Sequence, residues 1–383
     1  MIPNRLDYRF LSLATAGSVV LAAGSGVAPA SAANYYDGKT ITVMVGLAPG
    51  GTVDTFARQF SAVWEKYIPG KPNMIVKNMT GGGGLKATNF VYEAAKADGL
   101  TLYWGPWIPI AQALGTKGFR ARYEKFAFLG GTPDIRVSYA RTDSVPDGLK
   151  KPADIMKAKN MWVGGNAATG MAHLSARIPL DVLGVSYKQI VGYRGGSDVF
   201  LALQRNEVQY TGTSIGTFRR RSGNYVKAGH AMGLFYLVPV EANGSYERNK
   251  YITEMPTFPD LYKEIHGRMP SGPKWDALNW FTHLIGRMNY VGLAPPGTPA
   301  DAVAALRNGY KSASADAGFI EAWVKRNGIP PEFVDTKSGE KVIRTLAETD
   351  PKVLATFKEL LAAGSRADKV VKPQPRKKKK SSN

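Results

Sequence analysis

Hydrophobic positions along the chain alternate between short β-rich runs and stretches with helical spacing. Residues 41–45 form such a run, and the apolar residues of 53–67 recur every three or four positions, which predicts a helix. Residues 74–76 predict a second strand, 85–97 a second helix and 100–104 a third strand. Strand, loop and helix repeated at a spacing of about 30 residues is the unit of a parallel sheet.

The middle of the chain repeats this order. Residues 161–163 predict a short strand, and a glycine-rich loop then leads into a helix that begins near Met171. Residues 191–196 open another helix over 197–205, and a strand is expected at 208–211. This alternation predicts two α/β lobes with mostly parallel sheets. Two further strands are expected as crossovers between the lobes, one into the second lobe at 134–142 and one returning at 232–238.

The first residues have the organisation of an export signal. Arg5 and Arg9 precede an apolar stretch at 11–27, and Ala30–Ala32 supplies the small-x-small pattern that signal peptidase reads. We expect cleavage after Ala32 and a periplasmic mature protein. The alternative is an uncleaved membrane anchor, but the stretch is short and broken by glycine and proline, whereas a span needs about 20 apolar residues.

The chain is therefore expected to contain three functional parts and a tail. These are a signal peptide at 1–32, a discontinuous lobe I at 33–134 and 237–365, a lobe II at 135–236 and a basic tail at 366–383. The tail has too few apolar residues to bury and is expected to be disordered. Solvation or contact with a membrane surface is preferred for it over nucleic-acid binding, because an exported chain rarely meets nucleic acid. We expect a monomer.

Composition narrows the chemistry. The chain has no cysteine, which excludes disulfides, thiolate nucleophiles and zinc-thiolate sites. Its four histidines do not share a metal-ligand spacing, so neither a metal nor a cofactor is expected. The formal net charge is +20, and a basic surface raises the local concentration of anionic ligands.

Two loops that follow predicted strands are unusually rich in glycine. The first contains Gly46, Gly50 and Gly51, and the second contains residues 81–84. In open α/β sheets, ligands bind at the carboxyl ends of the strands. Glycine lets main-chain N–H groups approach a ligand, and helix N-termini favour a negative group. The loops indicate an anion site, although tight turns alone are the structural alternative.

One segment suggests an enzyme instead. Residues 212–216 match the G-x-S-x-G nucleophile elbow with Ser214 as nucleophile, and Asp260 and His266 or His283 follow in the order of a serine hydrolase. Residues 217–221 lack the buried helix face that such an elbow needs, and no HGGG-type oxyanion segment is present. Binding without catalysis is therefore preferred.

Several segments together carry a family resemblance. They are residues 45–54 with the following Ala57 and Arg58, 76–84, 97–102, 193–196 with 204–208, and 292–299. In this order, from about residue 36 to residue 361, they resemble the Bug receptors. These TctC-like proteins are the periplasmic solute-binding components of tripartite tricarboxylate transporters.

The resemblance implies a type II periplasmic-binding-protein fold, with two α/β lobes joined by crossover strands and a ligand cleft between them. It also implies capture of a small organic acid for integral-membrane permease subunits, with no catalysis. A receptor that presents its ligand to a sensor kinase is a second possibility that the sequence does not separate from transport.

The resemblance also implies the residues that bind the ligand. One carboxylate would be held largely by main-chain groups and bridging waters of Pro49, Gly50, Gly51, Thr52 and Asp54, and of Thr80, Gly81, Gly82 and Gly83. The second lobe would hold the other end with Ala168, Thr169, Gly170, Met171 and His173, next to Arg194, Gly195, Thr213 and Ser214. Main-chain donors demand only an anionic oxygen, so one scaffold can accept different acids.

Two features depart from the family pattern. Many relatives carry an acidic residue near Thr213, and a hydroxyl there cannot pair with an ammonium group, so an amino-acid ligand is not expected. The aromatic stretch 256–290 is longer than usual and either packs as an insertion or reshapes the rim of the site. Trp104 and Trp107 follow a strand and either stack on an aromatic acid or pack in the core.

Overall fold

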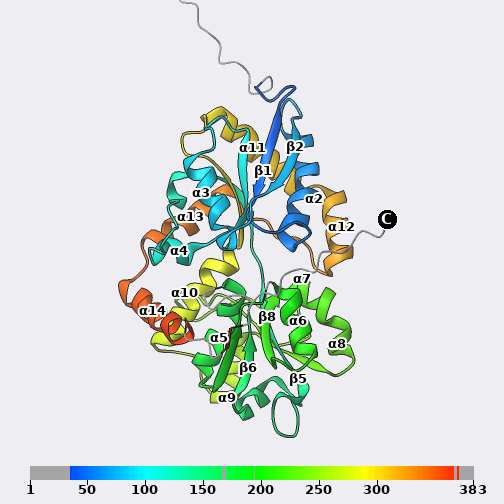
Figure 1. Cartoon of the computed structure of the whole chain (residues 1–383), viewed down its shortest axis with the longest axis vertical. Helices are drawn as coiled ribbons and strands as arrows, with labels where there is room; N and C mark the ends of the chain where they lie inside the picture. Colours follow the sequence, from blue (N-terminus) through cyan, green and yellow to red (C-terminus); the bar gives the residue numbers. More distant parts are fainter. Residues whose placement is uncertain (1–34, 166–169, 194, 366–368, 371–383) are drawn as a thin grey trace, which may run out of the picture. The chain divides into compact units, whose positions relative to one another are not determined.

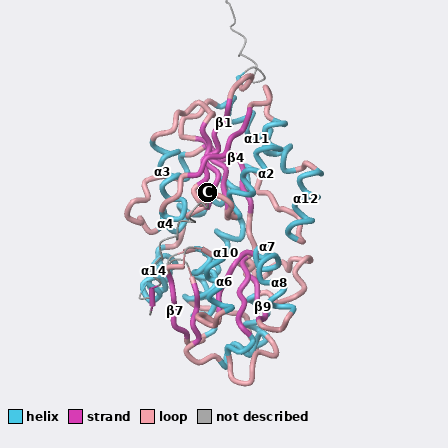
Figure 2. Tube along the Cα trace, turned by 45° about the vertical axis from the view of Figure 1, so that its right-hand side comes forward, coloured by secondary structure: helices cyan, strands magenta, loops and turns pink. Residues whose placement is uncertain are grey.

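The computed structural model describes residues 35–165, 170–193, 195–365 and 369–370, which form two sheets within one compact unit (Figures 1 and 2). The first sheet has the order β2 (Asn73–Asn78), β1 (Thr40–Val45), β3 (Thr101–Pro106), β10 (Tyr290–Ala294) and β4 (Ala127–Thr132). β1 runs parallel to β2 and β3, whereas β10 is antiparallel to β3 and β4. The three strands predicted near the N-terminal end of lobe I are confirmed.

Alternating side chains of β1 enter two different cores, because successive residues of a strand point to opposite faces. Ile41, Val43 and Val45 pack with α2 (Thr52–Tyr67) and α11 (Ala300–Ser314), whereas Met44 packs on the opposite face. That opposite face is covered by α3 (Leu85–Glu93) and α13 (Thr336–Ala347). The first sheet is thus buried on both sides.

The second sheet is mixed. Its order is β11 (Lys369–Val370), β7 (Tyr187–Val191), β6 (Met161–Gly164), β8 (Tyr210–Ser214), β5 (Arg136–Arg141) and β9 (Ala231–Tyr236). β6 runs parallel to β7 and β8, and β5 is antiparallel to β8 and β9. The predicted α/β lobes are confirmed. β11 lies within the tail that was expected to be disordered, and that prediction is wrong for Lys369–Val370.

The helices that cover the second sheet come from distant parts of the chain. α5 (Met171–Leu183) shares a core with α9 (Phe258–His266), α10 (Pro273–Arg287) and α14 (Pro351–Ser365). The prediction assigned 237–365 to lobe I, and it is wrong for these three helices. Their apolar faces are buried against the second sheet, as Phe281, Phe357 and Leu360 are at 0%, 0% and 6% exposure.

α10 contributes to the cores of both sheets. Leu278 and Phe281 pack in the core of the second sheet, whereas Leu284 packs in the core on one face of the first sheet. The chain then enters β10 of the first sheet. The return between the lobes therefore follows α10 rather than the predicted strand at 232–238, which is β9 of the second sheet.

The aromatic stretch 256–290 mainly packs in the interior. Trp275 stacks on Phe258, with ring centroids 6.1 Å apart, and the Trp280 indole donates to the Thr349 hydroxyl at 3.1 Å. This favours the packing interpretation of the insertion, apart from Tyr290, which faces a cavity described below.

Shorter elements complete the described fold. They are the helices α4 (Pro109–Ala113), α6 (Gly196–Gln204), α7 (Ile215–Thr217), α8 (Gly223–Lys227) and α12 (Ala317–Asn327), the π-helix η5 (Phe218–Ser222), and the 3-10 turns η1 (Gly82–Gly84), η2 (Tyr123–Lys125), η3 (Thr142–Ser144) and η4 (Pro152–Lys157). Within the described ranges, none of the helices has the length and apolar character needed to cross a membrane.

Candidate functional site

The two glycine-rich loops of the first lobe lie against each other. A side chain on Gly46 would place its Cβ 2.7 Å from the Cα of Gly84, so only glycine permits this approach. The Met79 N–H donates to the Val45 oxygen at 2.9 Å, which holds the two strand ends together. The loops that the sequence singled out are therefore brought to one edge of the first sheet.

Asp54 organises the first loop from inside. It is 3% exposed, and its carboxylate accepts hydrogen bonds from the Gly50 N–H and the Asn78 amide, both at 2.8 Å, and from the Arg58 guanidinium. Burial would raise the pKa of Asp54, but these donors outweigh it and hold the pKa below its usual value. The Asp54 carboxylate thus binds its own loop, and the Gly50 N–H is used for this hydrogen bond.

The second loop needs glycine for its backbone. Gly81, Gly82, Gly83 and Gly84 have φ values of 150°, 57°, 67° and 109°, in the region that L-residues with side chains rarely adopt. This bend ends at α3, whose first residue is Leu85. Most of the predicted contacts of the first lobe are exposed at the sheet edge, namely Pro49, Gly50, Gly51, Thr80, Gly81, Gly82 and Gly83. Thr52 is the first residue of α2.

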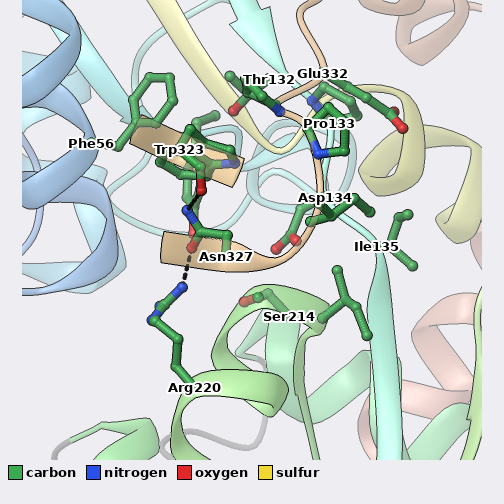
Figure 3. Close-up of a pocket in the computed structure, with 16 residues that line it drawn as sticks. Phe56, Thr132, Pro133, Asp134, Ile135, Ser214, Arg220, Trp323, Asn327 and Glu332 are labelled. Atoms are coloured by element: carbon green, nitrogen blue, oxygen red, sulfur yellow. Dashed lines mark hydrogen bonds between the residues drawn. The ribbon is translucent and has the colours of Figure 1, made fainter. Parts of the chain in front are cut away.

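A cavity that opens to solvent lies between the lobes, with about 720 Å³ of empty space including its open mouth (Figure 3). We call it the interlobe cavity. It is lined by Phe56 of α2, by residues 132–135 between β4 and β5, by Ser214, Ile215, Gly216 and Arg220 of the second lobe, and by Tyr290, Trp323, Asn327 and residues 329–332. Both lobes therefore contribute to one chamber.

Among the described residues that line the interlobe cavity, Arg220 is the one with a cationic side chain. Figure 3 shows its side chain reaching from the second lobe to the amide oxygen of Asn327, and it lies 3.4 Å from the Thr217 hydroxyl. Burial, together with Arg326 and Arg221 nearby, lowers the pKa of Arg220 from its usual value. Its hydrogen-bond partners among the described residues are neutral oxygens, so its charge is not cancelled by a direct ion pair.

Two carboxyl groups also line the interlobe cavity. Asp134 lies 3.4 Å from the Arg136 guanidinium, and burial raises its pKa. Burial likewise raises the pKa of Glu332, whose carboxylate accepts a long hydrogen bond from the Asn249 amide at 3.4 Å. Both groups are therefore easier to protonate than exposed carboxylates.

Aromatic rings form one wall of the interlobe cavity. Phe56 meets Trp323 edge-on, with ring centroids 5.2 Å apart, and stacks on Trp104 on its other side at 5.3 Å. Trp104 is 2% exposed and Trp107 is 1% exposed. The prediction that Trp104 contacts the ligand is not supported by this placement, because Phe56 and the core surround it.

A second cavity, of about 470 Å³, lies within the second lobe, and we call it the lobe II cavity. It is lined by Tyr139, Gly164, Gly165, Ala172, His173, Gly196, Val199, Thr211, Gly212, Thr213, Thr217, Arg221 and Ser222. Thr213 faces this cavity, whereas the next residue, Ser214, faces the interlobe cavity, as expected for neighbours on a strand.

The other predicted residues of the second lobe have mixed outcomes. Gly170 precedes the first turn of α5, Met171 is its first residue, and Gly195 precedes α6. Ala168, Thr169 and Arg194 lie outside the described residues. Sequence reasoning missed Arg220, Arg221, Trp323 and Asn327; the run of three arginines after β8 was the available signal for the first two.

The hydrolase hypothesis is wrong for the described geometry. The Ser214 hydroxyl donates to the Thr217 hydroxyl at 2.8 Å, not to a histidine. His283 Nε2 lies 2.9 Å from the Val240 oxygen, and the Asp260 carboxylate accepts from Arg248 and Tyr246. No triad is assembled around Ser214 among these residues. Nor do the described ranges contain a cluster of three or more acidic or histidine side chains suited to a metal.

No protein-family model matches the chain. A curated UPF0065 protein of Bordetella pertussis is 26% identical over 307 residues, covering 78% of this chain and 83% of that protein. The fold is similar to the periplasmic binding protein BugD, with a TM-score of 0.60 and 18% identity over 85% of this chain and 98% of BugD.

Two further solved structures give a similar result. A TctC solute-binding protein from Polaromonas has a TM-score of 0.58 and 18% identity, over 86% of this chain and 99% of that one. R. palustris Rpa4515, solved with adipate, has a TM-score of 0.61 and 18% identity, over 84% and 98%. The periplasmic-binding-protein fold is thereby confirmed, and in fold the chain is similar to Bug and TctC solute-binding proteins.

Proposed function

We propose that this chain is a periplasmic receptor that captures a small carboxylate-bearing molecule, without chemistry, for a tripartite tricarboxylate-type permease. The observation that carries the proposal is the interlobe cavity, because both lobes line it and Arg220 enters it with neutral partners only among the described residues. A receptor that closes on its ligand needs such a chamber shared between lobes.

Arg220 would pair with a carboxylate of the ligand. A guanidinium presents two parallel N–H donors that match the two oxygens of a carboxylate, and such charge-assisted bonds are stronger than neutral ones. Phe56, Trp323 and Tyr290 would pack against the carbon skeleton.

The glycine-rich loops of the first lobe would add main-chain donors. Residues 80–83 stand at the N-terminal side of α3, where unpaired N–H groups favour an anion. This part of the site remains a prediction, together with lobe closure. Asp54 would act indirectly, since its carboxylate holds the loop rather than facing the cavity.

The remaining parts of the proposal come from the resemblance. Rpa4515 is described with adipate, a dicarboxylate, which supports an acid as the ligand of this related fold. The periplasmic binding proteins among the neighbours support a periplasmic location. Cleavage after Ala32 and delivery to permease subunits are proposed on the same grounds.

Calorimetry on the mature chain tests the function. The panel is adipate, malate, citrate and benzoate, with adipamide as the neutral match for adipate. We expect at least one acid to bind and the neutral amide not to bind. Arg220→Gln should lower the affinity for that acid at least about tenfold, since a hydrogen bond to a charged group contributes roughly 1.5–3 kcal/mol.

Arg205→Gln is the matched control, because Arg205 carries the same charge on the same lobe but is 70% exposed, 3.9 Å from Glu207. It should leave affinity unchanged within about twofold. Failure of all four acids to bind, or equal losses in the two variants, would contradict the proposed function.

A further inference from the structure

Charge is distributed unevenly around the interlobe cavity. Arg220 lies on one side, with Arg221 and Arg326 nearby. Figure 3 shows Glu332 on the far side from Arg220, and the Asp134 side chain points into the cavity between them. An anionic group of a ligand is therefore attracted to one end of the chamber, whereas carboxyl groups stand toward the other.

The lining residues can neutralise one carboxylate but not two. Among the described residues that line the cavity, Arg220 is the one cation, whereas Asp134 and Glu332 are acidic. Arg136 is not a lining residue, and its guanidinium contacts Asp134 and Asn289. A second carboxylate on the ligand would lose water without gaining a cation, and it would be repelled by like charge.

Asp134 is the carboxyl group best placed to repel that second charge. Its side chain is 13% exposed, whereas Glu332 is an exposed residue. The contacts of the Asp134 carboxylate with Arg136 and with the Asn289 amide are long, at 3.4 Å and 3.5 Å. Ion pairs with good geometry are shorter than this, so the negative charge of Asp134 is only partly compensated.

The remaining walls of the cavity favour an apolar body on the ligand. They include the aromatic rings of Phe56, Tyr290 and Trp323 and the isoleucines at 135, 215 and 329. The Trp323 ring meets Phe56 edge-on at 5.2 Å and is half-buried, so part of it can still be covered by a ligand. Covering such surfaces with an alkyl or aryl group stabilises the complex by removing apolar area from water.

We propose that the interlobe cavity selects a monocarboxylate with an apolar body, and that Asp134 is the residue that rejects a second carboxylate. The inference rests on the proposed function and narrows its ligand class. Arg220 would bind the single carboxylate, and the aromatic and isoleucine side chains would bind the carbon skeleton. Specificity of this kind comes from a repulsive element as well as from an attractive one.

Two matched pairs of acids test the inference by calorimetry on the purified protein. Hexanoate differs from adipate, and 4-methylbenzoate from terephthalate, by a methyl group in place of the second carboxylate. We expect the monocarboxylate of at least one pair to bind at least about tenfold more tightly than its dicarboxylate. Arg220→Gln should lower the affinity for that monocarboxylate at least about tenfold.

Asp134→Asn tests the source of the preference. The variant removes the charge but keeps a side-chain oxygen for Arg136, and circular dichroism verifies its folding. The ratio of the two affinities in the preferred pair should fall at least about fivefold, because the dicarboxylate gains affinity. Asp37→Asn is the matched control, since Asp37 is exposed and is not a lining residue, and the ratio should stay within about twofold.

Trp323→Leu tests the apolar wall without any change of charge. It should lower the affinity for the preferred monocarboxylate at least about threefold, since less apolar area is covered. Val324→Ala is its control, because Val324 is on the same helix but is 37% exposed and is not a lining residue. These two variants and the wild-type pairs decide the inference even if Asp134→Asn does not fold.

The outcomes separate this inference from the proposed function. If acids bind and require Arg220 but neither monocarboxylate is preferred, the inference is overturned and the function stands. The inference is also overturned if the preference persists in Arg220→Gln, if Asp134→Asn folds and matches Asp37→Asn, or if Trp323→Leu matches Val324→Ala. If no acid binds in either panel, the function fails and the inference fails with it.

Discussion

Arg219 of η5 donates a hydrogen bond to the backbone oxygen of Gly328, 3.1 Å away, at the C-terminal end of α12. Arg220 binds Asn327, the preceding residue, so two consecutive arginines of the second lobe hold one helix end of the first. Cations are favoured at helix C-termini, where unpaired carbonyls concentrate negative charge.

Removing this contact should destabilise the described arrangement. Arg219→Gln is expected to lower the free energy of unfolding by about 1 kcal/mol, because the Arg219–Glu254 pair is partly exposed and its contribution is reduced by solvent. Urea denaturation measures the change. Arg205→Gln should change it by less than about 0.5 kcal/mol, and equal losses in both variants would contradict a role for the helix-end contact.

Gly46→Ala tests the close approach of the two loops. The new Cβ would meet the Gly84 backbone at 2.7 Å, so the loops must separate, at a cost of roughly 1–3 kcal/mol in the free energy of unfolding. Affinity for any bound acid should fall as well. Gly223→Ala is the control, since Gly223 lies in α8 with nothing within 4 Å of its Cβ position, and it should be neutral or slightly stabilising.

Asp54→Asn should give a pH-dependent loss of stability. Because the folded pKa of Asp54 lies below its usual value of 3.8, its contribution is fully present above that value and is lost as the pH falls through the folded pKa. We expect a loss of about 1–3 kcal/mol at pH 7. Denaturation from pH 7 down to pH 3 measures it. If the difference in unfolding free energy between the two proteins stays constant down to pH 3, the ionised Asp54 carboxylate is not the source of the stabilisation.

Phe357→Ala tests the assignment of α14 to the core of the second sheet. Phe357 is fully buried there, next to Phe281 at a ring distance of 5.5 Å. Truncation should cost about 3–5 kcal/mol of unfolding free energy. The exposed Glu359→Ala on the same helix should cost little. Hydrogen exchange of α5 amides should accelerate in the first variant only, and no acceleration would refute the shared core.

Local patterns predicted the first lobe well. The apolar spacing over 53–67 corresponds to α2 (Thr52–Tyr67), because one buried helix face is a local property of the sequence. The glycine loops were also recognisable, since the positive φ values of residues 81–84 require that residue type.

Long-range partners were not predictable in the same way. The apolar face of α14 is visible in the sequence, but nothing in its spacing tells which sheet it covers. The opposite directions of Arg220 and Arg221 depend on the π-helical turn at Phe218–Ser222, which has no simple residue signature. Asp54 looked like a ligand contact, because its partner Asn78 lies 24 residues away on the next strand.

The placement of α10 in both cores has a mechanical consequence. Leu278 and Phe281 of this helix pack in the core of the second sheet. Leu284, less than two turns further along the same helix, packs in a core of the first sheet. Unfolding of either core therefore removes α10 from the core of the other sheet as well. Calorimetric heating should therefore give one cooperative endotherm instead of two, despite the bilobal design.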